Sequence, residues 1–350
     1  MKKKISIIGS GNWGTTIGKL IAENIANNPA YDEEILMWTY EELIGNEKIT
    51  DIINNTHINV KYLPGIKLPL TLVAHPNLEF VASCADLLVF VLPHQFVKRI
   101  CLELKQIKLK KNVIGINLSK GMIDVDNNVM LISEYIEREL GFDVSVLMGA
   151  NIAMDVAKGC VSEGTLGYSN ERNGRIWYSI FNCYTYRVVM VCDKCGVELS
   201  GTLKNIVSLG YGIGCGLGYP TNTTVAIMRE GLIEIIRFYK VFHPEASVET
   251  LFESSGVADL IVSCLSGRNF KCGKMIGEKR CSIEEVENGM GGQKLQGTLT
   301  AKEIYKLLSR KEMIREFPLF VAVYRICYEN ELPDSILGCI SYTSIDDGVL

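Results

Sequence analysis

The sequence predicts an α/β N-terminal domain with a doubly wound, mostly parallel sheet, followed by an all-α C-terminal domain. Short β-branched runs alternate with helix-like stretches up to about residue 192, and a Gly-x-Gly-x-x-Gly motif joins the first strand to the first helix. From Val197 onward the apolar residues recur at helical spacing. We therefore expect two domains, residues 1–192 and residues 193–350.

The first strand and helix form the most specific part of this pattern. The β-branched run Ile5–Ile8 leads directly into Gly9–Gly14, and an apolar helical pattern follows. A Rossmann-type fold needs this order of strand, tight turn and helix, because the glycines permit the turn and a close approach of pyrophosphate to the backbone. The alternative is a glycine-rich turn that binds no ligand.

The other elements follow from runs of apolar residues. The predicted strands are Ile35–Trp38, Leu70–Val73, Leu87–Leu92, Val113–Leu118, Val144–Met148, Asn151–Tyr168 and Tyr184–Val191, with a helix around Asn170–Asn182. In the second half, Thr223–Phe242 has a broad apolar face that is typical of a buried helix. In the cluster Gly210–Gly218, no choice of starting glycine gives a second Gly-x-Gly-x-x-Gly motif. The cluster instead indicates close helix packing followed by a turn.

Composition and charge exclude several classes of protein. The chain has 350 residues and a net charge of −4, so it has no overall positive field to attract nucleic acid. Its apolar runs are far too short to span a membrane. The 12 cysteines are scattered, as expected for a cytoplasmic protein. Cys192 and Cys195 form one Cys-x-x-Cys pair, which indicates buried thiols or a redox pair, and we expect no metal site.

The end of the second strand bears on the choice of dinucleotide. In this fold it faces the adenosine ribose, and here Glu41 and Glu42 follow it with no basic residue before Lys48. Carboxylates suit a free ribose hydroxyl and repel a 2′-phosphate, which favours NAD(H) over NADP(H). The alternative is that both glutamates simply begin a solvated helix.

Three polar groups in the second half are candidates for chemistry. Lys204 lies in an apolar helical run, so it is either a lysine whose stem reaches the surface or a buried proton donor. The segment Ser266–Asn269 has backbone amides and the guanidinium group of Arg268, which together suit a phosphate. The alternative is that it is an ordinary helix N-cap. Gly292–Gly297 is a polar loop that suits either a ligand or solvent.

Taken together, these segments resemble NAD-dependent glycerol-3-phosphate dehydrogenase, nearly from end to end. The motifs that carry the resemblance are Gly9–Gly14, Val60–Gly65, Val91–Phe96, Leu118–Gly121, Leu147–Ala153, Gly196–Glu198, Leu203–Asn205, Ser255–Leu260, Gly267–Asn269 and Gln293–Gly297. The resemblance implies reversible reduction of dihydroxyacetone phosphate to sn-glycerol 3-phosphate by NADH. It also implies a homodimer.

The resemblance assigns roles to residues on the substrate side. Lys204 occupies the position of the catalytic lysine, and Lys120 that of a second lysine near the substrate. Asn205 and Asp259 match polar residues beside the catalytic lysine. The substrate-binding positions match Lys120, Arg268, Asn269 and Ser263, which stands where the animal enzymes have Thr.

On the cofactor side the resemblance covers both halves of the chain. The matching residues are Gly9, Ser10, Gly11, Asn12, Trp13, Gly14, Tyr40, Phe96, Ala153, Arg268, Lys294 and Gln296. Tyr40 replaces the usual Phe of the animal enzymes, and Met154–Glu163 is unlike them. The glycine spacing at Gly289–Gly292, just before Lys294 and Gln296, is also irregular.

Two other functions remain to be distinguished. A dehydrogenase for 2-hydroxy or 3-hydroxy acids pairs the same nucleotide domain with a helical one, and Arg268 would then bind a carboxylate. A catalytically silent NAD(H)-binding sensor would bind NADH tightly without turnover.

Overall fold

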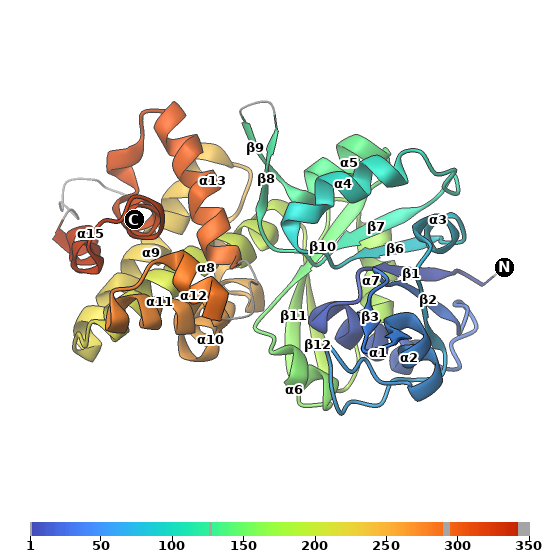
Figure 1. Cartoon of the computed structure of the whole chain (residues 1–350). Coiled ribbons are helices and arrows are strands. Elements are labelled where there is room, and N and C mark those ends of the chain that lie inside the picture. Colours follow the sequence, from blue (N-terminus) through green and yellow to red (C-terminus); the bar gives the residue numbers. More distant parts are fainter. Residues whose placement is uncertain (1, 126–127, 290–294, 342–350) are drawn as a thin grey trace. The chain divides into compact units, whose positions relative to one another are not determined.

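The computed structural model describes residues 2–125, 128–289 and 295–341, and the chain divides into two compact units (Figure 1). Unit 1 comprises Met1–Ser119 and Ile132–Lys194, and unit 2 comprises Lys120–Leu131 and Cys195–Leu350. The chain therefore contributes to unit 2 twice, first through a short internal segment and then through its C-terminal part.

Unit 1 is built on an eight-stranded sheet with the order β12-β11-β10-β7-β6-β1-β2-β5. The strands are β1 (Ile5–Ile8), β2 (Ile35–Trp38), β5 (Leu72–His75), β6 (Leu87–Phe90), β7 (Ile114–Asn117), β10 (Val144–Met148), β11 (Ser162–Gly167) and β12 (Tyr186–Val191). Neighbouring strands are parallel, except that β11 runs antiparallel to β10. The predicted doubly wound, mostly parallel sheet is thus confirmed.

Helices cover both faces of this sheet, which explains why its central strands are continuous apolar runs. The helices of unit 1 are α1 (Asn12–Ile25), α2 (Ile49–Thr56), α3 (Leu78–Ser83), α4 (His94–Leu104), α5 (Ile132–Leu140), α6 (Ala153–Ala157) and α7 (Glu171–Phe181). Helices α3, α4 and α5 pack in a row, and α1 packs against α6 and α7 on the other side of the sheet (Figure 1). A short hairpin, β3 (Leu43–Ile44) and β4 (Glu47–Lys48), precedes α2.

One predicted element of unit 1 is wrong in part. The expected strand Asn151–Tyr168 is a helix at its start, α6, and becomes strand only at Ser162. The chain must reverse direction here because β11 is antiparallel to β10, and α6 fills the reversal by packing on α1. The Thr16 hydroxyl of α1 donates a hydrogen bond to the Ala153 carbonyl at 3.3 Å. Gly159, at a φ of 78°, follows the helix end.

Within its described residues, unit 2 is helical apart from one hairpin. Its helices are α8 (Lys194–Gly216), α9 (Thr221–Phe242), α10 (Asp259–Ser266), α11 (Arg268–Lys279), α12 (Ile283–Gly289), α13 (Gln296–Arg310), α14 (Pro318–Tyr328) and α15 (Gly338–Ser341), with the short turns η1 (Val248–Phe252), η2 (Ser254–Ala258), η3 (Ile314–Glu316) and η4 (Pro333–Leu337). The hairpin of β8 (Met122–Val125) and β9 (Asn128–Leu131) packs against α13. Among the helices described, none is both long and apolar enough to cross a membrane.

Glycines allow α8 and α11 to approach each other closely. A Cβ atom on Gly212 of α8 would lie 2.4 Å from the Phe270 carbonyl oxygen of α11. Conversely, a Cβ atom on Gly273 of α11 would lie 2.2 Å from the Leu209 carbonyl oxygen of α8. The two backbones are therefore in contact, and the interpretation of this glycine cluster as a close helix-packing site is confirmed.

Candidate functional site

The turn after β1 in unit 1 is shaped by its glycines. Gly9 has a φ of 120°, and a Cβ atom there would lie 2.3 Å from the Val91 carbonyl oxygen. A Cβ atom on Gly14 would lie 2.1 Å from the Gly9 carbonyl oxygen, whereas one on Gly11 would meet nothing within 4 Å. The packing therefore requires Gly9 and Gly14, and Gly11 leaves open space at the start of α1.

The N-terminus of α1 opens onto this space. Gly11 is the N-cap residue, so no side chain caps the helix, and the described first turn contains no acidic residue. Its first amide groups are thus not occupied by a capping side chain and can bind an anion. The residues fit a dinucleotide pyrophosphate.

Asn59 holds this turn in place and was not singled out from the sequence. Its buried amide Nδ2 donates to the Ser10 carbonyl oxygen at 3.0 Å and to Thr15 Oγ1 at 2.9 Å, and its Oδ1 accepts from the Tyr62 amide at 3.1 Å. Asn12 Nδ2 donates to the Tyr62 carbonyl at 2.7 Å. The only signal in the sequence is that Asn59 immediately precedes the Val60–Gly65 motif.

The other predicted cofactor residues of unit 1 lie on different elements. Trp13 is half-buried in the first turn of α1, and Ala153 begins α6. Tyr40, beyond β2, is 67% exposed, and Phe96, in α4, is 44% exposed. These aromatic rings are available for contact with a ligand, since they are not packed into the core.

Glu41 and Glu42 both have partners within unit 1. Glu41 Oε2 accepts a hydrogen bond from Thr50 Oγ1 at 2.7 Å, in the first turn of α2. Glu42 forms an ion pair with Lys61, and its hydrogen bond raises the pKa of that lysine. Both glutamates lie before the β3–β4 hairpin and neither begins a helix, so the alternative of a solvated helix start is wrong. Each carboxylate has a structural partner within unit 1.

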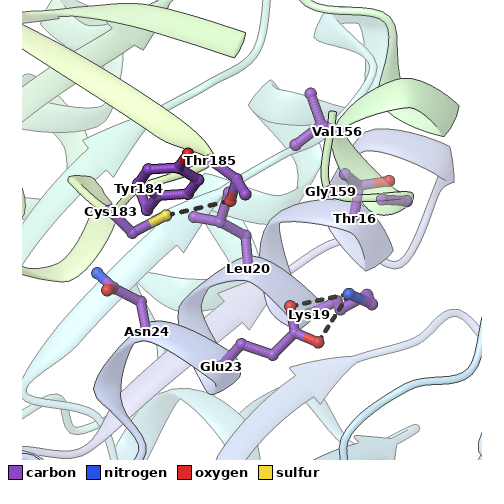
Figure 2. Close-up of a pocket in the computed structure, with 11 residues that line it drawn as sticks. Thr16, Lys19, Leu20, Glu23, Asn24, Val156, Gly159, Cys183, Tyr184 and Thr185 are labelled. Atoms are coloured by element: carbon purple, nitrogen blue, oxygen red, sulfur yellow. Dashed lines mark hydrogen bonds and ion pairs between the residues drawn. The ribbon is translucent and has the colours of Figure 1, made fainter. Parts of the chain in front are cut away.

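Unit 1 has a pocket whose lining includes no residue of the glycine turn Gly9–Gly14 (Figure 2). It is lined by residues of α1, α6 and the turn before β12, and it contains none of the predicted cofactor residues. Lys19 and Glu23 pair in this pocket at 2.7 Å, so the lysine charge is neutralised (Figure 2). The pocket is therefore a poor site for phosphate.

In unit 2, two lysines meet at one buried carboxylate. Lys204, in the middle of α8, donates to Asp259 Oδ1 at 2.6 Å and also to Ser263 Oγ. Lys120 donates to Asp259 Oδ2 at 2.7 Å. Lys204 and Asp259 are 4% and 2% exposed. The structure thus brings together four predicted site residues that are up to 143 positions apart in the sequence, from Lys120 to Ser263.

Burial controls the protonation of Lys204. Burial lowers the pKa of Lys204, Asp259 opposes this effect and the nearby charge of Lys120 adds to it, and together these effects place the pKa at about 8. A lysine with this pKa is mainly protonated at neutral pH and can also release its proton. The interpretation of Lys204 as a surface-reaching lysine is wrong, since the ammonium itself is buried.

An irregular turn places Asp259 at the start of α10. The preceding π-helical segment η2 contains Gly256 in a non-helical conformation, with φ −98° and ψ −108°. A Cβ atom on Gly256 would lie 2.1 Å from the Leu251 carbonyl oxygen, so a larger residue would displace this turn. Single π-helical turns occur often at functional sites. This geometry explains why the Ser255–Leu260 motif has a glycine at position 256, before Asp259.

A chain of amide groups extends from the lysine cluster to α13. Asn269 Nδ2 donates to Asn205 Oδ1 at 2.9 Å, and Asn269 Oδ1 accepts from the Gly297 amide at 3.0 Å. Gln296 Nε2 donates to the Lys120 carbonyl at 3.2 Å. Asn205, Asn269 and Gln296 are therefore fixed relative to Lys120.

Thr202 is a further residue of this network to which the sequence assigned no role. Its Oγ1 accepts a hydrogen bond from the Gly121 amide at 3.0 Å. Thr202 lies on α8 two positions before Lys204, and Gly121 follows Lys120. This bond ties the segment that carries Lys120 to the helix that carries Lys204.

Arg268 and Lys294 complete the predicted set. Arg268 is the first residue of α11, directly after the N-cap residue Gly267, and it is exposed. Its neighbour Asn269 is buried in the amide network. Lys294 lies outside the described residues.

Family models described as the N-terminus and the C-terminus of NAD-dependent glycerol-3-phosphate dehydrogenase match residues 4–174 and 193–338. The chain is 45% identical over 340 residues to the cytoplasmic NAD(+) glycerol-3-phosphate dehydrogenase of Bos taurus, covering 97% of each. It is 45% identical over 339 residues to the glycerol-3-phosphate dehydrogenase 1-like protein of Xenopus tropicalis, covering 96% of each.

A solved structure agrees with these matches. The glycerol-3-phosphate dehydrogenase of Plasmodium falciparum superposes with a TM-score of 0.93 at 41% identity. The match covers 99% of this chain and 97% of that one.

Proposed function

Because this chain belongs to the NAD-dependent glycerol-3-phosphate dehydrogenase family, we propose that it reversibly reduces dihydroxyacetone phosphate to sn-glycerol 3-phosphate with NADH. The observation that carries the proposal is the buried ammonium of Lys204, held by Asp259 and Ser263 beside a second lysine. A silent sensor would have no need of a buried, partly deprotonable lysine.

Lys204 is the proposed proton donor. When bound, NADH supplies the hydride that the carbonyl carbon C2 receives. The Lys204 ammonium stabilises the negative charge that develops on the ketone oxygen and transfers a proton to it. In the reverse direction the neutral amine accepts the hydroxyl proton. Asp259 fixes the position of the ammonium at 2.6 Å, and Ser263 is its second acceptor.

Lys120 has a different proposed role, because its ammonium is only partly buried. Its side chain is 22% exposed, and Asp259 holds it on the other carboxylate oxygen. From there Lys120 would orient the substrate and help to polarise it. Its charge also lowers the pKa of Lys204, which makes proton transfer easier.

The substrate phosphate is assigned to Arg268 and Asn269. Both begin α11, where backbone amides and the helix dipole favour an anion. The exposed Arg268 fork matches a phosphate bidentately, and Asn269 is already positioned by Asn205 and Gly297. A carboxylate would also suit Arg268, so phosphate recognition must be tested directly.

The dinucleotide is assigned to the turn and helix start of unit 1. Gly9–Gly14 would bind the pyrophosphate through backbone amides, as the open space at Gly11 allows. Tyr40, Phe96 and the Ala153 backbone would contact other parts of the cofactor. Arg268 and Gln296 are further cofactor contacts implied by the family, as is Lys294.

Location and assembly rest on the family as well. The relatives from Bos taurus and Rattus norvegicus are named cytoplasmic, and we assign this chain to the same compartment. The family also implies a homodimer. Sedimentation of the purified chain would test it, and a mass near 38.9 kDa at all concentrations would contradict it.

The decisive experiment follows NADH oxidation by absorbance with dihydroxyacetone phosphate. Parallel reactions contain NADPH or unphosphorylated dihydroxyacetone. Rapid turnover only with NADH and the phosphorylated ketone supports the reaction, the cofactor and the need for a phosphate-binding residue. NADH binding without turnover would favour the sensor, and turnover of a 2-hydroxy or 3-hydroxy acid would favour the other dehydrogenase.

A further inference from the structure

Three potential metal ligands meet in unit 2, in a place unrelated to the lysine cluster. Cys195 Sγ lies 3.3 Å from His243 Nδ1 and 3.4 Å from Glu245 Oε1. His243 Nδ1 lies 3.1 Å from Glu245 Oε1. The three ligand atoms thus form a nearly equilateral triangle, made of one sulfur, one nitrogen and one oxygen.

The fold positions each of these ligands. Cys195 lies in the first turn of α8, where the helix dipole favours a negatively charged thiolate. His243 is the C-cap residue of α9, and its ring stacks on the buried Phe238 at a centroid distance of 6.1 Å. The turn that follows is closed by a hydrogen bond from the Ala246 amide to the His243 carbonyl at 2.9 Å, and it carries Glu245.

From this geometry we propose that Cys195, His243 and Glu245 bind one Zn²⁺ ion, with water as the fourth ligand. Zinc prefers thiolate, imidazole and carboxylate ligands in a tetrahedral arrangement. Its usual bond lengths give edges of about 3.6 Å from sulfur to nitrogen or oxygen and about 3.4 Å from nitrogen to oxygen. The observed edges are shorter by about 0.3 Å or less, so only a small outward movement is needed.

Charge and protonation also suit a divalent cation. The Cys195 thiol releases its proton to solvent on binding, and no oxidation or reduction occurs. The thiolate and the Glu245 carboxylate then supply two negative charges, which balance those of Zn²⁺. Glu245 is mostly exposed, so the ion can enter from solvent.

This site is not the Cys-x-x-Cys pair that the sequence analysis considered. Cys192 and Cys195 form a Cys-x-x-Cys pair, but the described cluster joins Cys195 to residues 48 and 50 positions farther along the chain and leaves Cys192 out. Lys204 is nine residues farther along α8, or about 13 Å at 1.5 Å per residue. Zinc here would therefore link the start of α8 to the end of α9 rather than take part in the proposed chemistry.

The test uses the full-length protein after removal of metal with a chelator. Zn²⁺ is titrated in competition with a chromophoric chelator, and Co²⁺ is added separately to look for thiolate-to-cobalt absorption. We expect one Zn²⁺ per chain, the cobalt-thiolate band, and a higher Tm with Zn²⁺. Cys195→Ser and His243→Gln should each weaken Zn²⁺ binding at least about 10-fold, and Cys195→Ser should also remove the band.

Two further variants keep the result interpretable. Cys192→Ser changes the other cysteine of the pair and should leave affinity, band and Tm shift unchanged. Glu245→Gln alters an exposed side chain, so it should fold normally while weakening Zn²⁺ binding. Unchanged affinity in Cys195→Ser, equal loss in Cys192→Ser, or the absence of any stoichiometric binding by the parent protein would overturn the proposal.

Discussion

Lys204 is the residue on which the proposed chemistry depends most directly. We expect Lys204→Ala to lower kcat at least about 100-fold, because a positioned general acid contributes about 10²–10⁴-fold. Its Kd for NADH, measured by fluorescence, should stay nearly unchanged, since the glycine turn belongs to unit 1. Lys274→Ala, an exposed lysine of α11 paired with Glu278, is the matched control and should retain full activity. Near-normal turnover by a folded Lys204→Ala protein would remove Lys204 from the mechanism.

Arg268 tests the recognition of the phosphate. Arg268→Ala should mainly raise KM for dihydroxyacetone phosphate, and Arg268→Lys should give an intermediate KM because it keeps the charge but loses the bidentate fork. Arg280→Ala, at the other end of α11, removes only an exposed pair with Asp334 and should leave KM unchanged. If KM in Arg268→Ala equals that of the parent enzyme, another residue binds the phosphate.

Asn59 is expected to position the cofactor turn. Asn59→Ala should raise Kd for NADH about 10-fold and cost about 1–3 kcal/mol of unfolding free energy, because a buried carbonyl and hydroxyl lose their donor. Asn54→Ala is matched to it, since Asn54 makes two hydrogen bonds to the Ala74 backbone elsewhere in unit 1. Its stability should fall by a similar amount while its Kd for NADH stays constant. Equal effects on Kd in both variants would reduce Asn59 to a purely structural residue.

For single residues, the sequence predicted which side chains belong to the site better than it predicted the contacts that they make. Lys204, Lys120, Asp259 and Ser263 were all named through the family resemblance, and they do meet. Asn59 and Thr202 were not assigned roles, because each acts through hydrogen bonds to residues far away in the sequence. A single Asn or Thr in a sequence carries no sign of such a partner.

Among the elements, the contact between α8 and α11 gives the sharpest prediction. Gly212→Ala should destabilise the protein by about 1–3 kcal/mol, because the new methyl group would strike the Phe270 carbonyl and force the two backbones apart. This cost exceeds the gain of about 1 kcal/mol that Ala brings to a helix. Urea unfolding measures the difference.

Gly338→Ala is the matched control for this helix contact. Gly338 begins α15 with helical angles of φ −57° and ψ −28°, and a Cβ atom there would meet nothing within 4 Å. We therefore expect Gly338→Ala to leave stability unchanged or to raise it by up to about 1 kcal/mol. A Gly212→Ala protein as stable as Gly338→Ala would mean that α8 and α11 can separate at no cost.

The elements of the sheet could be read from the sequence because their apolar runs are long and are bounded by turns. Helix α6 and the β8–β9 hairpin could not be read from it. Helix α6 is only five residues long and follows a strand directly, so Asn151–Tyr168 was expected to be a single strand. The β8–β9 hairpin, which packs on α13, lies between strands of the sheet in the sequence, and nothing local marks it as part of unit 2.

For the molecule as a whole, this interrupted path of the chain has a chemical consequence. Residues 120–131 join unit 2, and Lys120 thereby reaches Asp259 and shares one carboxylate with Lys204. The charge balance of the proposed site, two ammonium groups on one carboxylate, is thus set by tertiary structure. Neither composition nor spacing in the sequence contains this information.

The same charge balance predicts how the direction of the reaction depends on pH. Reduction needs the Lys204 ammonium, so its initial kcat should fall as pH rises through about 8, and oxidation of glycerol 3-phosphate should rise over the same interval. Asp259 favours the charged form, so Asp259→Asn should lower the pKa of Lys204 further and move both transitions to lower pH. Initial rates from pH 6.5 to 9.5, at saturating substrate, measure these profiles. If both transitions stayed at the same pH in a folded Asp259→Asn protein, the titrating group would not be Lys204.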